Sequence, residues 1–337
     1  MGSIDRCKNK LTAANIGLLP WLCAASRRSK NKLHRSACEH SLNSRCATAA
    51  SPGRWLSWQP DTSNFKLKSI ILKKIIKRIF KITLLTLLAA ILTIVTIVLF
   101  PQHLFANKLN HKNFTVCSNN KIDNDIKTIL NNAMTLVEKS ELYDSNYKYN
   151  IVLCYNTLYN KIDDMLAGTG AAATPRGKNI LIKVRIDPKN NLAFATFHKA
   201  CEVNLTELIA HEMIHCLQAH KYGFLKFNPF KHPEFWKLEG YPEYISKQNE
   251  LSSEGYDLTS DINRYVNLKS KATDIWISSE DGGCEVPDYY YEGKVMMEYL
   301  MNIKHLSYDQ ILKDTLSEST VYQEMIKWKD NSKEVKH

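Results

Sequence analysis

The chain of 337 residues lacks internal repeats, a glycine-rich cofactor-binding loop and any pair of cysteines in Cys-x-x-Cys spacing. The missing pair leaves Cys38, His40 and Cys46 without the spacing that a small zinc knuckle needs. Apolar residues make up 44% of the chain, an ordinary share for a globular protein, so disorder of the whole chain is excluded. The length leaves room for one or two domains.

The formal net charge is +11, but most of the chain has no excess of basic residues. Residues 1–81 contain 17 Lys and Arg against 3 Asp and Glu, a net charge of +14, whereas residues 82–337 contain 28 against 31, a net charge of −3. A nucleic-acid-binding domain normally carries a basic patch on its folded surface. We therefore expect no nucleic-acid partner.

Charge is also missing from residues 82–100, a run of 19 mostly apolar residues. As a helix this run would be about 28 Å long, enough to cross a bilayer. Residues 70–81 before it form a basic amphipathic run, and residues 1–69, which lack a sustained apolar period, are predicted to be a disordered basic arm. A cleaved signal peptide and a buried helix of a soluble protein are the alternatives, but the length and the basic flank favour an uncleaved transmembrane helix.

The flanking charges also predict the orientation of this helix. Seven Lys and Arg lie between Lys66 and Lys81, and only Lys108 and Lys112 lie close on the other side. The positive-inside rule then places the N-terminus in the cytoplasm and the rest of the chain outside. Disulfides can form there, and five cysteines allow two bridges and one free thiol. We expect Cys216 to be the buried free thiol; the pairing of the others stays open: Cys117, Cys154, Cys201 and Cys284.

Apolar periodicity outlines the outer part of the chain. We expect a linker over residues 101–116, a folded domain over residues 117–330 and a C-terminal tail over residues 331–337. The predicted helices span residues 121–139, 158–165 and 289–301, with one or two more between 306 and 328. A turn-rich loop at 168–177 separates two predicted strands, at 149–154 and 179–186.

The clearest chemical signal is the HExxH motif from His211 to His215. On a helix, residues four apart lie on one face, so both imidazoles can bind a single ion while Glu212 stands beside it as a base. The expected helix begins after Asn204 as N-cap, with Glu207 three residues on, and ends at Gly223. The competing interpretation is a pair of ordinary core histidines.

A catalytic zinc normally takes three protein ligands, so a third must follow. The chain reads Glu-Gly-Tyr-Pro-Glu-Tyr from Glu239 to Tyr244. With the HExxH motif, this stretch resembles the peptidase MA-like gluzincins, over about residues 203–245. The resemblance implies that Glu239 is the third ligand and that Glu243 orients an imidazole. The family usually has Ala where this chain has Pro242, so we expect the second helix to begin near Glu239, because proline is tolerated in a first turn.

The resemblance implies two further features. A tyrosine hydroxyl stabilises the oxyanion in several gluzincins, which makes Tyr291 the predicted catalytic tyrosine, with Tyr290 as the alternative. The strand before the HExxH helix forms the sheet edge along which an extended substrate lies, which suggests this role for residues 179–186. An ordinary structural strand is the alternative.

Together these patterns predict an α+β, zincin-like metallopeptidase domain, with a small sheet packed on helices, behind a single transmembrane helix. The predicted function is hydrolysis of a peptide or protein substrate by a membrane-anchored zinc metallopeptidase. His211, His215 and Glu239 would bind Zn²⁺, and Glu212 would be the general base. The alternatives are a membrane-tethered metal-binding or interaction module without catalysis, and an assembly protein whose HExxH motif is accidental.

Overall fold

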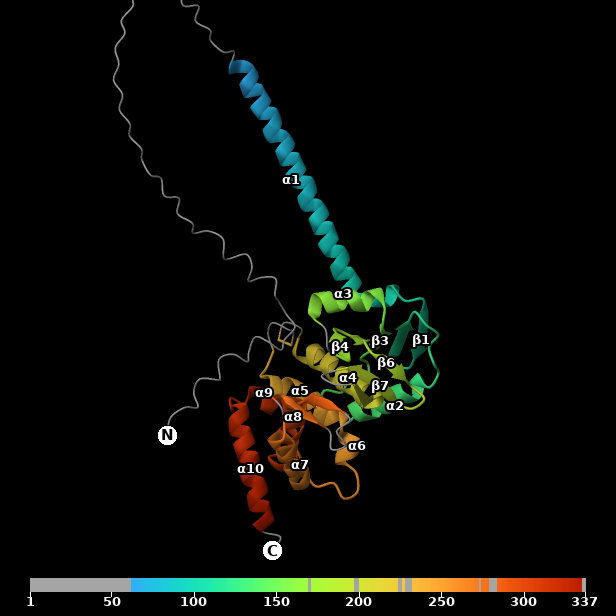
Figure 1. Cartoon of the computed structure of the whole chain (residues 1–337), viewed down its shortest axis with the longest axis vertical. Helices are drawn as coiled ribbons and strands as arrows, with labels where there is room; N and C mark the ends of the chain where they lie inside the picture. Colours follow the sequence, from blue (N-terminus) through green and yellow to red (C-terminus); the bar gives the residue numbers. More distant parts are fainter. Residues whose placement is uncertain are drawn as a thin grey trace, which may run out of the picture. The chain divides into compact units, whose positions relative to one another are not determined.

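The computed structural model describes residues 62–168, 171–196, 200–223, 226–227, 232–272, 274–278 and 284–334. The chain divides into two units, which are described separately. One contains most of helix α1 (Thr62–Leu99), and the other begins at Val95 and contains the folded domain (Figure 1). The domain is α+β, as predicted, with mixed sheets and several helices.

Helix α1 is one continuous element of 38 residues. The predicted basic run 70–81 and transmembrane segment 82–100 are parts of it, and the end of the predicted disordered arm, residues 62–69, is helical as well; residues 1–61 lie outside the described residues. The helix ends at Leu99 because Pro101 restricts the residue before it and has no N–H to donate. Its segment Leu72–Leu99 is long and apolar enough to cross a membrane.

The larger sheet has five strands in the spatial order β1-β2-β3-β5-β4. Its central strands β2, β3 and β5 are parallel, and both outer strands run antiparallel to their neighbours. The strands are β1 (Asn107–His111), β2 (Phe114–Ser118), β3 (Tyr149–Leu153), β4 (Ala173–Arg176) and β5 (Asn179–Ile182). The prediction that residues 101–116 form a linker was wrong. These residues contain β1 and most of β2, and Phe114 and Val116 of β2 belong to the core.

Both faces of this sheet are covered by helices. On one face α2 (Ile126–Val137) and α4 (Leu205–Tyr222) pack on Val116, Ile151 and Ile180. On the other face Tyr159, from α3 (Leu158–Ala167), packs with Val152 and Leu181. Successive strand residues point to opposite faces, and burial on both faces explains why these strands are almost continuously apolar.

The predicted strand 179–186 is divided between two sheets. Residues 179–182 form β5, and a second sheet contains β6 (Arg185–Asp187), β7 (Leu192–Thr196) and β8 (Ala200–Asn204). The break falls at Lys183, a buried residue whose ammonium bonds Asp163 at 3.1 Å. β5 lies between β3 and β4 and so is not a sheet edge; the edge next to it is β4, within the loop predicted for residues 168–177.

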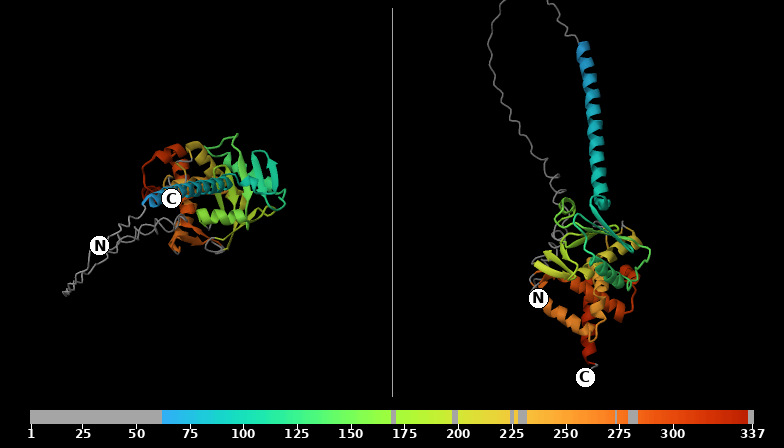
Figure 2. Two further views of the ribbon diagram at one scale, coloured as in Figure 1. Left: turned by 90° about the horizontal axis from the view of Figure 1, so that it is seen from above. Right: turned by 90° about the vertical axis from the view of Figure 1, so that its right-hand side faces the viewer.

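The C-terminal half is mainly helical, and Figure 2 shows its orange and red helices on one side of the domain and the green strands on the other. A two-stranded sheet of β9 (Trp276–Ser278) and β10 (Glu285–Pro287) precedes α8. The helices are α5 (Phe235–Ser246), α6 (Gln248–Leu251), α7 (Leu258–Ser270), α8 (Asp288–Glu298), the π-turn η2 (Tyr299–Ile303), α9 (Tyr308–Lys313) and α10 (Glu318–Glu334). α10 therefore extends into the predicted tail 331–337, of which residues 335–337 lie outside the described residues.

One disulfide joins Cys201, the second residue of β8, to Cys284, the residue before β10. Cys117, Cys154 and Cys216 are free and buried. The expectation for Cys216 is confirmed. Of the two bridges that five cysteines allow, the described domain forms one.

Candidate metal centre

Helix α4 carries the HExxH motif and begins and ends where the sequence predicts. The side chain of Asn204 accepts a hydrogen bond from the backbone N–H of Glu207 at 3.2 Å, and Gly223 ends the helix with φ of +89°. The Glu207 carboxylate, three residues after the cap, pairs with Lys247, the residue that follows α5, at 2.5 Å. Most of α4 is buried, which fixes the two histidines in place.

The second ligand helix, α5, begins at Phe235, so the expectation that it starts near Glu239 was wrong. Pro242 lies inside it. Gly240 lets α5 touch α8 backbone to backbone: a Cβ added at Gly240 would lie 2.7 Å from the carbonyl oxygen of Gly293. Because Gly240 follows Glu239 directly, this close crossing determines where the Glu239 carboxylate is held.

Three donor atoms meet between α4 and α5. The Nε2 atoms of His211 and His215 are 3.1 Å apart, and Oε2 of Glu239 lies 3.3 Å and 3.2 Å from them. Ligands of a tetrahedral zinc, at about 2.0–2.1 Å from the metal, are themselves about 3.3 Å apart. The triangle therefore has the size that one zinc ion requires. The three side chains keep exposed fractions of 9%, 10% and 13%, so the centre is reachable from solvent.

The charges of these groups favour a cation between them. Burial by itself lowers the pKa of His211, but the hydrogen bonds that its ring donates to the carboxylates of Glu239 and Glu243 outweigh burial and raise this pKa to about 10. Burial raises the pKa of Glu239, yet the two imidazoles hold it well below its ordinary value. A divalent ion would replace the proton on His211, so that metal binding releases a proton.

Glu212 supplies an independent reason to expect a ligand at this place. Its carboxylate is buried, and Oε2 has no hydrogen-bond partner among the described residues. Burial raises the pKa of this carboxyl, and the neighbouring His215 and His211 act in the opposite direction. A buried acceptor without a partner is costly, so a water beside the metal would satisfy it.

Each imidazole is oriented by a partner at its other nitrogen. His211 Nδ1 lies 3.1 Å from Oε2 of Glu243, as the resemblance implies, and His215 Nδ1 lies 2.8 Å from Oε1 of Gln218. Zinc-bound histidines normally have such a second partner, which fixes the ring and its tautomer. Glu243 also lies within the electrostatic reach of Lys247.

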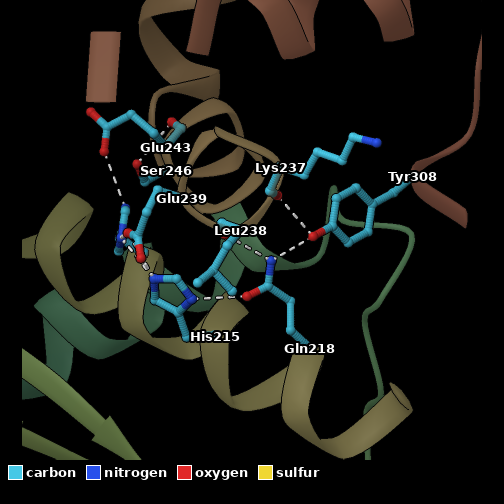
Figure 3. Close-up of polar contacts among 9 residues, drawn as sticks. His215, Gln218, Lys237, Leu238, Glu239, Glu243, Ser246 and Tyr308 are labelled. Carbon is cyan, nitrogen blue, oxygen red and sulfur yellow. Dashed lines mark hydrogen bonds and ion pairs between the residues drawn. The ribbon is translucent and has the colours of Figure 1, made fainter. Parts of the chain in front are cut away.

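Gln218 is fully buried and is held by a chain of hydrogen bonds, drawn in Figure 3. Its Nε2 donates to the Leu238 carbonyl at 3.0 Å and to the Tyr308 hydroxyl at 2.7 Å, and that hydroxyl donates to the Lys237 carbonyl at 3.0 Å. The proline in α5 explains this arrangement. Pro242 has no N–H, so the carbonyl four residues earlier, that of Leu238, lacks its helical partner and is free for Gln218.

The two candidate tyrosines of α8 lie in different places. The hydroxyl of Tyr291 donates to Asp261 on α7, so this side chain is held within a buried polar cluster instead of at the metal centre. The ring of Tyr290 packs edge-to-face on His211, with centroids 5.8 Å apart, and its surroundings include the carboxylates of Glu239 and Glu212. Neighbouring positions on a helix differ by about 100°, which is why only one of them can face the centre. The expectation that Tyr291 lies at the centre is therefore wrong, and Tyr290, the alternative, is the tyrosine that lies there.

Three residues of this centre were missed by sequence reasoning: Gln218, Gly240 and Gly293. Gln218 lies three residues after His215, on the same face of the helix, and this spacing was a usable signal. The contact between the two glycines joins residues far apart in the chain. No comparable local signal exists for it.

Comparison with protein-family models and with curated proteins gave no match for this chain. The geometry of the metal centre and the apolar helix α1 are therefore the observations on which a functional proposal can rest.

Proposed function

We propose that the protein is a membrane-anchored zinc metallopeptidase with a zincin-like catalytic domain. The observation that carries this proposal is the triangle of His211, His215 and Glu239 donor atoms, together with the unpartnered buried oxygen of Glu212 beside it. A structural zinc site uses four protein ligands and has no need of a buried base. Three ligands and a free carboxylate oxygen favour a hydrolytic site.

When bound, zinc would lower the pKa of a water molecule and polarise the scissile carbonyl. Glu212 accepts the proton of the attacking water and passes it to the leaving amine. Its raised pKa, caused by burial, suits a group that must hold a proton between the two steps. The Tyr290 hydroxyl is the candidate hydrogen-bond donor to the developing oxyanion. A donor already held in place stabilises the negative charge of the transition state.

The proposed topology places the N-terminus in the cytoplasm and the catalytic domain outside. It rests on the basic residues before the apolar part of α1. The Cys201–Cys284 disulfide supports it, because disulfides persist mainly outside the cytosol. Reporter fusions at His337 test it, since a C-terminus in the cytoplasm contradicts the orientation.

The decisive experiment compares wild type with Glu212→Gln in the purified full chain. We expect both to bind one zinc, measured by atomic absorption, and Glu212→Gln to cleave a peptide library at least about 100-fold more slowly. Glu202→Gln, the same change at an exposed position on β8, is the matched control and should cleave like wild type.

The other outcomes separate the alternatives. A folded, zinc-loaded wild type that cleaves no peptide favours the non-catalytic metal-binding module. A wild type that binds no zinc favours the accidental motif. Equal cleavage by wild type and Glu212→Gln would contradict the proposed mechanism, because the general base would then be elsewhere.

A further inference from the structure

Helix α3 presents an apolar face that no described residue covers. Leu158 and Met165 are 74% and 79% exposed, the largest exposed fractions of any large apolar side chain in the described part of the domain. They are seven residues apart, so they lie on one side of the helix, and Leu166 beside Met165 is exposed as well. The opposite side of α3 is buried through Tyr159 and Asp163.

This helix is bonded to the end of the apolar helix. Val95 to Leu99, the last turn of α1, belong to the same unit as the folded domain. The Tyr159 hydroxyl donates to the Val98 carbonyl at 3.2 Å, and Asn179 Nδ2 donates to the Leu99 carbonyl at 3.0 Å. Ile97 packs on the core that contains Tyr159. The end of the proposed membrane span and α3 are therefore fixed to each other.

The short segment that follows α1, next to Tyr159 of α3, also exposes apolar side chains. Phe100 and Leu104 are each 48% exposed, and Phe105 between them and β1 packs edge-to-face on Tyr159, with ring centroids 6.0 Å apart. Tyr155, just before α3, is 54% exposed. Aromatic and apolar side chains at the level where a span ends are typical of the membrane interface.

The charges of this region also suit a lipid surface. Asp163 of α3 is paired with Arg176 and Lys183, and Asp164 is paired with Lys183, so neither acid is left to repel lipid phosphates. The side chains of Lys161 on α3 and of Lys178, next to Asn179, are exposed. Lysines beside an apolar helix face extend to anionic headgroups while their stems stay on apolar surface.

We propose that α3 and the segment Phe100–Phe105 form a membrane-docking surface, which lies in the lipid interface and holds the catalytic domain against the bilayer in one orientation. The partner is the bilayer itself, in the leaflet where the span ends. This inference rests on the membrane anchor of the proposed function. A second contact with lipid, besides the span, would keep the same side of the domain turned toward the bilayer.

The test is a fluorescence-quenching measurement on the full chain in nanodiscs of phosphatidylcholine and phosphatidylglycerol. A fluorophore is attached to Met165→Cys, to Ile91→Cys at the middle of the span, or to Glu254→Cys in the exposed turn after α6. The labels at 165 and 254 are quenched by lipids with a doxyl group near the headgroup, and the label at 91 by lipids with a doxyl group deep in the acyl chain. Background labelling is removed by changing the N-terminal cysteines to serine: Cys7, Cys23, Cys38 and Cys46.

We expect the label at 165 to be quenched several-fold more than the label at 254. Adding Leu158→Asp, at a position too exposed to affect folding, should return the label at 165 to the level of the label at 254. If the label at 91 is quenched but the label at 165 behaves like that at 254, docking is wrong and the anchor stands. If neither the label at 91 nor the label at 165 is quenched, both the membrane anchor and the docking surface are wrong.

Discussion

The contact between Gly240 and Gly293 makes a sharp prediction about the metal centre. A Cβ added at Gly240 would lie 2.7 Å from the Gly293 oxygen and 2.8 Å from its carbonyl carbon, whereas ordinary contacts begin near 3.4 Å. The obstructing atoms are backbone and cannot rotate away, so α5 and α8 must separate locally by roughly 0.7 Å in Gly240→Ala.

This displacement is large compared with what a metal site tolerates. Ligand distances must hold to about 0.2 Å, and the affected residue lies next to Glu239. We expect Gly240→Ala to weaken zinc binding by more than the roughly 10- to 100-fold that loss of an outer partner costs. Competition with a chelating dye, at a temperature where both proteins are folded, measures this loss.

The sign of the stability change is also diagnostic. Without the contact, Gly→Ala inside a helix would stabilise the protein by about 1 kcal/mol. Overpacking of this kind costs up to about 3 kcal/mol, so we expect a net loss of about 2 kcal/mol. In a domain of this size that lowers the melting temperature by about 4–8 °C.

Two further glycine variants serve as controls. Gly293→Ala introduces a Cβ at the same helix crossing but on α8, 2.8 Å from the Gly240 Cα. It should weaken zinc binding as Gly240→Ala does. Gly255→Ala should destabilise through its φ of +85° while meeting no atom within 4 Å, and should keep its zinc. A Gly240→Ala protein that is as stable as wild type and binds zinc equally well would refute the reasoning.

Two other predictions concern the candidate metal centre, and a third concerns a buried carboxyl of α8 outside it. Gln218→Ala should weaken zinc binding roughly 10- to 100-fold, because His215 loses the partner of its Nδ1; unchanged affinity in dye competition would rule out an orienting role. Tyr290→Phe should lower the rate of peptide cleavage and leave KM nearly unchanged, whereas Tyr291→Phe should alter thermal stability without a selective loss of rate; the reverse pattern would restore Tyr291 as the catalytic tyrosine. Burial raises the pKa of the Glu298 carboxyl from 4.5 to about 7. Its stabilising contribution is then complete below pH 4.5 and lost as the pH rises through 7, so thermal melts of Glu298→Gln should show a smaller fall in stability over this window than wild type.

Local sequence was sufficient for the parts of the centre that lie on one helix. The spacing of His211 and His215, the cap at Asn204 and the stop at Gly223 all depend on residues within a few turns of each other, and helix geometry alone then fixes which side chains share a face. The apolar helix α1 was predictable for the same reason, since its length and composition are properties of one continuous run.

Glu239 and Glu243 were assigned by resemblance to a family motif, and the structure brings both carboxylates to the imidazoles that the resemblance implied. The effect of Pro242 was misjudged, because local rules treat a proline inside a helix as a defect. Here the carbonyl that it leaves unpaired is taken up by Gln218, from another helix. That compensation is a tertiary contact and has no trace in the local sequence.

The remaining features were decided by packing between distant segments. Residues 101–116 read as a linker because β1 and β2 gain their stability only from pairing with each other and with β3. The choice between Tyr290 and Tyr291 depended on which side of α8 faces the centre, and this follows from how α8 packs on α5 at Gly240 and Gly293. The sequence by itself therefore determined which residues can bind a metal and where an apolar helix lies. The tertiary structure alone decided which glutamine and which tyrosine lie at the candidate metal centre, because those positions depend on how helices from distant parts of the chain pack against each other.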